Sequence, residues 1–207
     1  MWKGYYDNEI DYSEYDSNND GYIDALYIVY TTPIDYDSDT SMWWAYTYEY
    51  YTDDYEFYDN VEVDYYCFFG YDFLFEIPAC EKSLTLNTET IIHETGHLLG
   101  LDDYYDYDDS KGPDGGLGGG DMMDYNVGDH NPFTKILLGW VSPYICRMSM
   151  NIDLRSFASS GDCIMVIPFY EETVFTEFFL LDYYTPTGLN TLEAGYCGLL
   201  REERPEV

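Results

Sequence analysis

Residues 88–103 read TETIIHETGHLLGLDD, and this stretch says the most about the fold. Four apolar residues within it are spaced as on one face of a helix: Ile91, Ile92, Leu98 and Leu99. Asn87 or Thr88 suits the N-cap, and Glu89 falls in the first turn, where the helix dipole favours an acid. Gly100 stands where a glycine commonly ends a helix. The pattern therefore predicts a helix over residues 88–99.

The middle of this helix carries the pattern HExxH, at His93-Glu94-Thr95-Gly96-His97. Residues four apart lie on the same face of a helix, so both imidazoles can bind one ion. Neutral imidazole is a good ligand for zinc. Glu94 follows the first ligand directly, which suits a general base for a water that the metal activates. The pattern indicates a zinc site on the helix.

The residues after the helix extend the pattern to HExxHxxGxxD. Gly100 permits a sharp turn, and that turn can bring Asp103 back as a third, oxygen ligand. Three protein ligands leave one position open for water, as in catalytic zinc sites. Asp102 and Asp106 are the alternative third ligands. The competing interpretation is a pair of core histidines beside a surface acid.

Residues 121–125 read DMMDY and follow a glycine-rich loop. Met123 suits the methionine turn that lies beneath the metal in metzincin peptidases. Tyr125 could place its phenol near the zinc and stabilise an oxyanion, although a packed or surface tyrosine fits equally well in a chain with 26 tyrosines. His130 is expected to form a local hydrogen bond, and a role beside the zinc or the substrate is the alternative.

A second metal pattern, DSNNDGYID, occupies residues 16–24. It matches the first nine positions of an EF-hand-type calcium loop, in which oxygens converge on the ion and the glycine permits the tight turn. The expected calcium ligands are Asp16, Asn18, Asp20, the carbonyl of Tyr22, and Asp24. Position 12 is Tyr27 rather than glutamate, and a strand is expected next. We therefore expect a structural calcium site, with an acidic turn that holds no ion as the alternative.

The rest of the chain reads mainly as strands. Runs of β-branched and aromatic residues predict strands, with a short edge strand before Pro78 and a second helix that begins at Pro132. The expected strands are 22–30 (buried), 42–50, 61–69, 71–78 (edge), 163–169 and 174–182, and the second helix is 132–140.

Composition excludes several classes of protein. The 207 residues carry a formal net charge of -33, which excludes an electrostatic nucleic-acid binder and argues against docking on anionic membranes. An aromatic content of 20% argues against a disordered chain. No apolar run is long enough for a membrane span. The five cysteines lie far apart and form no CxxC, so a cysteine-built zinc site is not expected.

These motifs together resemble the immune inhibitor A-type bacterial zinc metallopeptidases, which are metzincin-like. The resemblance is carried by YDSNNDGYIDALYIVY (15–30), HETGHLLGLDDYYDYD (93–108), GGLGGGDMMDYNVGDHNPFTKILLGWVSPY (115–144) and EFFLLDYYTPTGLNTLEAGYCGLL (177–200). It implies an α+β zincin fold with a twisted mixed sheet, an active-site helix and a β-rich C-terminal segment. By the motif, His93, His97 and Asp103 correspond to zinc ligands and Glu94 to the catalytic base.

The resemblance also implies a function and a setting. We expect a secreted, monomeric zinc endopeptidase (a hydrolase) with zinc and calcium as cofactors, and protein or peptide substrates. Residues 1–143 would form the catalytic core with the calcium loop, and 144–207 a β-rich continuation that is cut short; the signal and propeptide would lie outside this chain. The alternative function is a catalytically inactive, calcium-stabilised extracellular binding module on the same scaffold.

Overall fold

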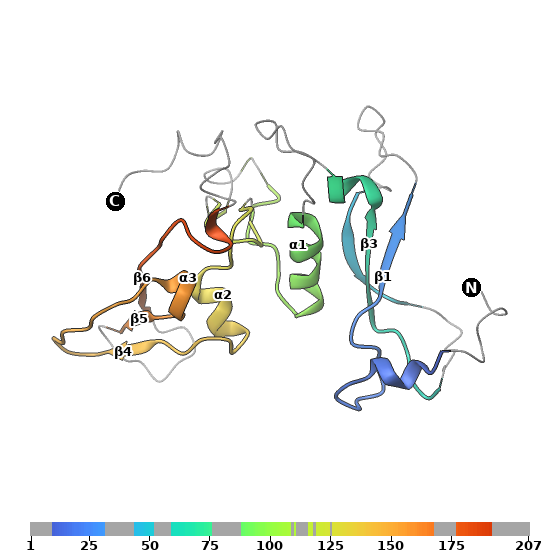
Figure 1. Cartoon of the computed structure of the whole chain (residues 1–207), viewed down its shortest axis with the longest axis horizontal. Helices are drawn as coiled ribbons and strands as arrows, with labels where there is room; N and C mark the ends of the chain where they lie inside the picture. The colour runs from blue at the N-terminus through green and yellow to red at the C-terminus, as the bar shows by residue number, and fades with distance from the viewer. Residues whose placement is uncertain are drawn as a thin grey trace. The chain divides into compact units, whose positions relative to one another are not determined.

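The computed structural model describes residues 10–31, 44–51, 59–75, 88–108, 110, 116–117, 119–124, 126–167 and 177–191. They form a small α+β fold with two three-stranded mixed sheets and short helices (Figure 1). This confirms the predicted α+β class, with the strands divided between two sheets. The chain forms two compact units, Met1–Ile77 with Ser83–Gly100, and Pro78–Lys82 with Leu101–Val207. The functional division expected after residue 143 stays a prediction.

The sheet of the first unit has the order β1-β3-β2. Its strands are β1 (Tyr27–Tyr30), β2 (Tyr46–Glu49) and β3 (Tyr65–Gly70). β3 is the central strand, with β1 parallel and β2 antiparallel to it. A 3-10 turn, η1 (Tyr12–Tyr15), precedes the acidic loop that leads into β1. All three strands are shorter than the runs that predicted them.

The strand predicted as buried over 22–30 is corrected in two respects. Only Tyr27–Tyr30 form the strand. Its first three side chains are exposed, at 38% for Tyr27, 40% for Ile28 and 46% for Val29. The reason is position, because β1 lies at one edge of the sheet and the central strand β3 supplies the buried Cys67 and Phe69.

The edge strand predicted over 71–78 is wrong where the structure describes it. Tyr71–Phe75 form a 3-10 helix, η3, and residues 76–78 lie outside the described part. Two consecutive side chains, Phe73 and Leu74, both pack on the cluster that contains Phe69. Successive side chains of a strand point to opposite faces. A helical turn can therefore bury this pair where a strand would not.

Helix α1 (Glu89–Leu98) confirms the predicted helix and packs on β2, β3 and η3. Ile91 and Leu98 lie against the hydrophobic cluster of the sheet. Thr88 is at the N-cap position without a side-chain capping bond. Gly100 follows the helix with a φ of 86°, a left-handed conformation in which glycine has no Cβ penalty.

The second unit contains the helices α2 (Pro132–Leu137) and α3 (Phe157–Ser160) and a sheet of order β4-β5-β6. Its strands are β4 (Tyr144–Cys146), β5 (Cys163–Val166) and β6 (Phe179–Asp182). The predicted second helix is confirmed, with Pro132 in its first turn and the Asn131 side chain accepting from Thr134 N. β4 and α3 were not predicted, and residues 168–176 lie outside the description.

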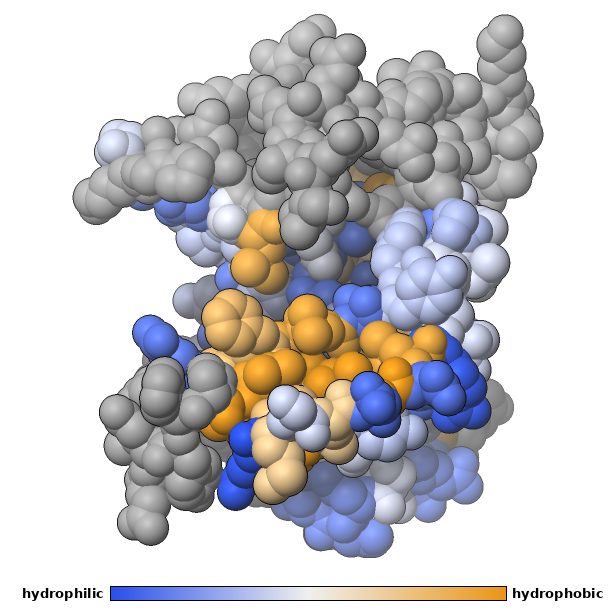
Figure 2. All heavy atoms as spheres, turned by 90° about the vertical axis from the view of Figure 1, so that its left-hand side faces the viewer, coloured by the Kyte–Doolittle hydropathy of each residue, from blue (hydrophilic) through white to orange (hydrophobic). Residues whose placement is uncertain are grey.

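This unit exposes several large apolar side chains, among them Leu137, Trp140, Ile145, Phe179 and Leu181. Figure 2 shows hydrophobic side chains gathered on one of its faces. Among the residues that the structure describes, no helix is long and apolar enough to cross a membrane.

Candidate metal centre

Helix α1 places the two histidines of the motif side by side. His93 and His97 are one helical turn apart, and their ring centroids lie 4.9 Å from each other with an interplanar angle of 86°. Both side chains are half-buried, so they are neither core residues nor freely solvated. The sequence dictates this arrangement locally, because i and i+4 share a face of any helix.

The chain segment after the helix brings an acid to the same place. Gly100 N donates to His97 O at 2.9 Å, and three residues later Asp103 completes a cluster with His93 and His97. One ligand atom from each of the three residues lies within 4.8 Å of the others. Within the described ranges, this is the only such group of histidine, cysteine or acidic side chains. Neither Asp102 nor Asp106, the alternative third ligands, belongs to it.

The donor set fits a zinc ion. Two imidazole nitrogens and a carboxylate oxygen are the ligands of many catalytic zinc sites, and they leave a coordination position open. The three donor atoms lie within 4.8 Å of one another, so the side chains converge on one place. The residues present therefore match the group that the sequence pattern implies.

A tyrosine that sequence reasoning missed supports the third ligand. The Tyr107 hydroxyl donates to Asp103 Oδ2. Partial burial of its phenol, together with this hydrogen bond and the nearby negative charge, raises the pKa of Tyr107 further above neutral pH, where a phenol is a proton donor. Hydrogen bonds to a ligating carboxylate commonly fix its orientation. The sequence signal that could have pointed to this contact is the run YYDYD at residues 104–108, in which tyrosines are interspersed with acids.

Glu94 turns toward the sheet of its own unit. Its side chain is 5% exposed, and Thr47 Oγ1 of β2 lies 3.0 Å from Glu94 Oε2 and 2.9 Å from Glu94 O. Cys67, opposite Thr47 in the sheet, is also fully buried. Burial, helped by the Glu94 charge, raises the pKa of the Cys67 thiol to about 12, which makes it unreactive as a nucleophile.

Met123 lies in a tightly held turn of the second unit. Its side chain is fully buried, and its backbone oxygen accepts from Tyr104 N at 2.8 Å. Its backbone nitrogen donates to Asp121 Oδ1 at 2.9 Å. Tyr125, the expected oxyanion residue, lies outside the described residues. The role of Met123 beneath a metal stays a prediction.

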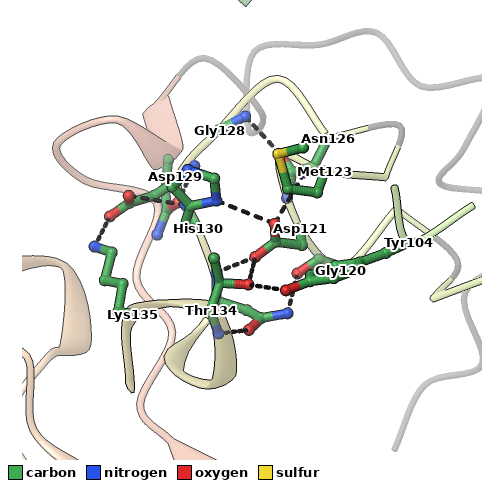
Figure 3. A network of polar contacts seen from close by, with 12 residues as sticks. Tyr104, Gly120, Asp121, Met123, Asn126, Gly128, Asp129, His130, Thr134 and Lys135 are labelled. Carbon is green, nitrogen blue, oxygen red and sulfur yellow. Dashed lines mark hydrogen bonds and ion pairs between the residues drawn. The ribbon is translucent and has the colours of Figure 1, made fainter. Parts of the chain in front are cut away.

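Asp121 organises this turn as the acceptor of several hydrogen bonds. Figure 3 shows its carboxylate between the His130 ring, 3.1 Å from Oδ1, and the Thr134 hydroxyl, 2.9 Å from Oδ2. Asn131 N donates to Oδ2 at 2.7 Å. His130 thus forms the local hydrogen bond expected of it. Burial opposes ionisation of Asp121, but its hydrogen bonds, led by that from His130, outweigh burial and lower its pKa.

Acidic side chains of loop 16–24 accept hydrogen bonds from backbone N–H groups of the same loop. Asp16 accepts from Asp20 N at 3.1 Å and from Gly21 N at 3.0 Å, and Asp24 Oδ2 accepts from Ser17 N at 3.1 Å. Gly21 has a φ of 93°, as the tight turn requires. Ile23 N donates to Glu62 O at 2.8 Å, which ties the loop to the segment before β3. The expected strand, β1, follows, while calcium binding stays a prediction.

We expect Asp103→Asn to weaken zinc binding by more than about 100-fold, because even lost support of a ligand costs about 10- to 100-fold. Asp102→Asn is the matched control, since its exposed side chain lies outside the cluster. Competition with a chromophoric chelator measures both affinities. Loss of zinc in the control with retention in Asp103→Asn would show that the third ligand is wrongly assigned.

We expect Asp121→Asn to lower the free energy of unfolding at pH 7 by about 2–4 kcal/mol, because buried donors lose a charged acceptor. The folded pKa of Asp121 is depressed, so its stabilisation is present above the unfolded pKa of about 3.9 and is lost as the pH falls through the folded value. The difference from wild type should therefore shrink toward pH 3 in urea unfolding. A pH-independent difference would contradict this, and the exposed Asp153→Asn is the control.

Comparisons with known proteins do not place the chain in a family. A scan against protein-family profiles, a search of curated proteins and a search of solved structures each found no match. The cluster of His93, His97 and Asp103, with Glu94 beside it, is the feature of the structure that bears on the chemistry of the site.

Proposed function

We propose that the protein is a zinc-dependent endopeptidase with a metzincin-like catalytic site. The observation that carries the proposal is the grouping of His93, His97 and Asp103 within 4.8 Å, on a helix that also bears the buried Glu94. Two further features support it: the glycine turn at Gly100 and the resemblance of the motifs to immune inhibitor A-type metallopeptidases.

His93, His97 and Asp103 would hold the zinc. A bound zinc would supply Lewis acidity, which polarises a peptide carbonyl. It would also lower the pKa of water, so that water can lose a proton and act as a nucleophile at neutral pH. Glu94 accepts the proton that the attacking water loses as its oxygen bonds to the carbonyl carbon. Glu94 then delivers this proton to the amide nitrogen as the carbon–nitrogen bond breaks. The second proton of the water also ends on the amine, so the products are a carboxylate and an ammonium group, and Glu94 returns to its ionised form.

The other predicted residues complete the proposal. Met123 would form the floor of the site, and Tyr125 would donate its phenol to the oxyanion that develops on the carbonyl. The loop 16–24 would bind a structural calcium ion. A secreted, monomeric protein that acts on proteins or peptides fits the resemblance. The net charge of -33 would steer basic substrates toward the protein.

We expect Glu94→Gln to keep one zinc per chain and to lose turnover by about 10²- to 10⁴-fold, since the amide cannot carry the proton. Zinc content by mass spectrometry and cleavage of casein and peptide libraries by the zinc-loaded full chain measure the two effects. His97→Ala should lose the zinc itself. Unchanged proteolysis in Glu94→Gln would contradict the proposal, and an intact zinc site in a wild type that cuts nothing but binds a ligand would favour the inactive binding module.

We expect about 10 mM calcium to raise the free energy of unfolding by about 1.4–2.7 kcal/mol, if the loop binds with the 10⁻⁴–10⁻³ M dissociation constants of extracellular sites. Asp16→Asn should abolish this gain, because Asp16 is the first oxygen ligand of the pattern. The control is Glu49→Gln, which removes an exposed charge from β2. Magnesium at the same concentration tests charge screening, and equal stabilisation by both ions in all three proteins would rule out the site.

A further inference from the structure

Thr47 makes two contacts with Glu94 from a different part of the chain. The Thr47 hydroxyl lies 3.0 Å from Glu94 Oε2 and 2.9 Å from the Glu94 backbone oxygen. The two residues are 47 positions apart, so the contact depends on how α1 packs on β2. Neither the HExxH pattern nor the strand pattern points to Thr47.

The strand holds this hydroxyl rigidly. β2 is paired along its length with β3, with Tyr46 opposite Phe68 and Glu49 opposite Tyr65. Thr47 itself lies opposite the fully buried Cys67. A β-branched threonine has few accessible χ1 rotamers, so its hydroxyl is fixed by the backbone and by packing. Glu94, in contrast, has a long side chain whose carboxylate needs a partner to stay in one orientation.

The Thr47 hydroxyl is expected to donate its proton to the Glu94 carboxylate rather than to the Glu94 backbone oxygen. A hydroxyl has one proton and can donate it to only one of the two oxygens at a time. A hydrogen bond to an ionised carboxylate is about twice as strong as one to a neutral acceptor. At 5% exposure, the Glu94 carboxylate has little water to replace that donor.

We infer that Thr47 is a positioning residue for Glu94: its hydroxyl holds Oε2 and thereby fixes the orientation from which the carboxylate takes and returns a proton. The inference rests on the proposed function. It also explains the second contact, because the hydroxyl can turn its proton to the backbone oxygen while Glu94 carries the proton from water. No heavy atom has to move for this exchange.

A purely structural role for Thr47 would be to tie α1 to the sheet. Thr95 offers a matched comparison, because its hydroxyl also lies between α1 and the sheet, 2.9 Å from the Tyr27 hydroxyl, and donates to Ile91 O. Thr47→Val and Thr95→Val remove the same group from the same helix–sheet contact. Only the first loses a hydrogen bond to the Glu94 carboxylate.

The experiment compares Thr47→Val, Thr47→Ser and Thr95→Val in the zinc-loaded full chain. We expect Thr47→Val to lower kcat by about 10- to 100-fold with KM within about twofold, because misplacing a catalytic group by about 1 Å can cost about 100-fold. Thr47→Ser should recover kcat to within about threefold, and Thr95→Val should keep it. Zinc content should stay at one per chain in all three.

A readout on the metal-free protein tests the contact without any activity. Thr47→Val and Glu94→Ala should each shift Tm, and the double variant should shift Tm by less than the sum of the two. Additive shifts, or an unchanged kcat in Thr47→Val while Glu94→Gln is inactive, would overturn the inference and leave the proposed function standing. A wild type without zinc-dependent hydrolysis would overturn both.

Discussion

The packing of α1 on its sheet is the constraint on which the candidate site depends. The helix buries Glu94 and Gly96, and Ile91 and Leu98 lie against the hydrophobic cluster. His93 and His97 stay half-buried and reach a shared point with Asp103. The motif needs both conditions at once, because its base has to be fixed by the protein while its ligands stay accessible to an ion. A ten-residue helix is too short to be stable alone, so this packing also maintains the helix.

The excess of acid shapes the rest of the chain. There are 41 aspartate and glutamate residues against 8 lysine and arginine residues, so most carboxylates have no cation to pair with. The structure instead supplies backbone N–H groups to many of them, as for Asp121 at Met123 and Asn131, and for Asp16 at Asp20 and Gly21. Hydrogen bonds of this kind favour the charged form and order the loops that carry it. Metal ions at the two predicted sites would reduce the remaining repulsion.

Much of the candidate site was predictable because it is encoded locally. The spacing of His93 and His97, the helix that carries them and the glycine turn after it need only the 3.6-residue period and the conformational freedom of Gly100. The start of α2 at Pro132 follows from a local rule too, since proline suits the first turn of a helix. Where local signals were ambiguous, the prediction failed: residues 71–75 have strand-like composition, yet packing of Phe73 and Leu74 on the sheet selects a 3-10 turn.

The sequence by itself determined the helix, its two imidazoles and the position of Glu94 between them, because each depends on neighbours within a turn or two of chain. Only the tertiary structure decided which of Asp102, Asp103 and Asp106 joins the cluster, since that depends on the path of the chain beyond Gly100. It also decided that Thr47 contacts Glu94 and that Asp121 binds His130. These contacts join residues 47 and 9 positions apart, so they depend on how the chain closes its loops and packs its elements.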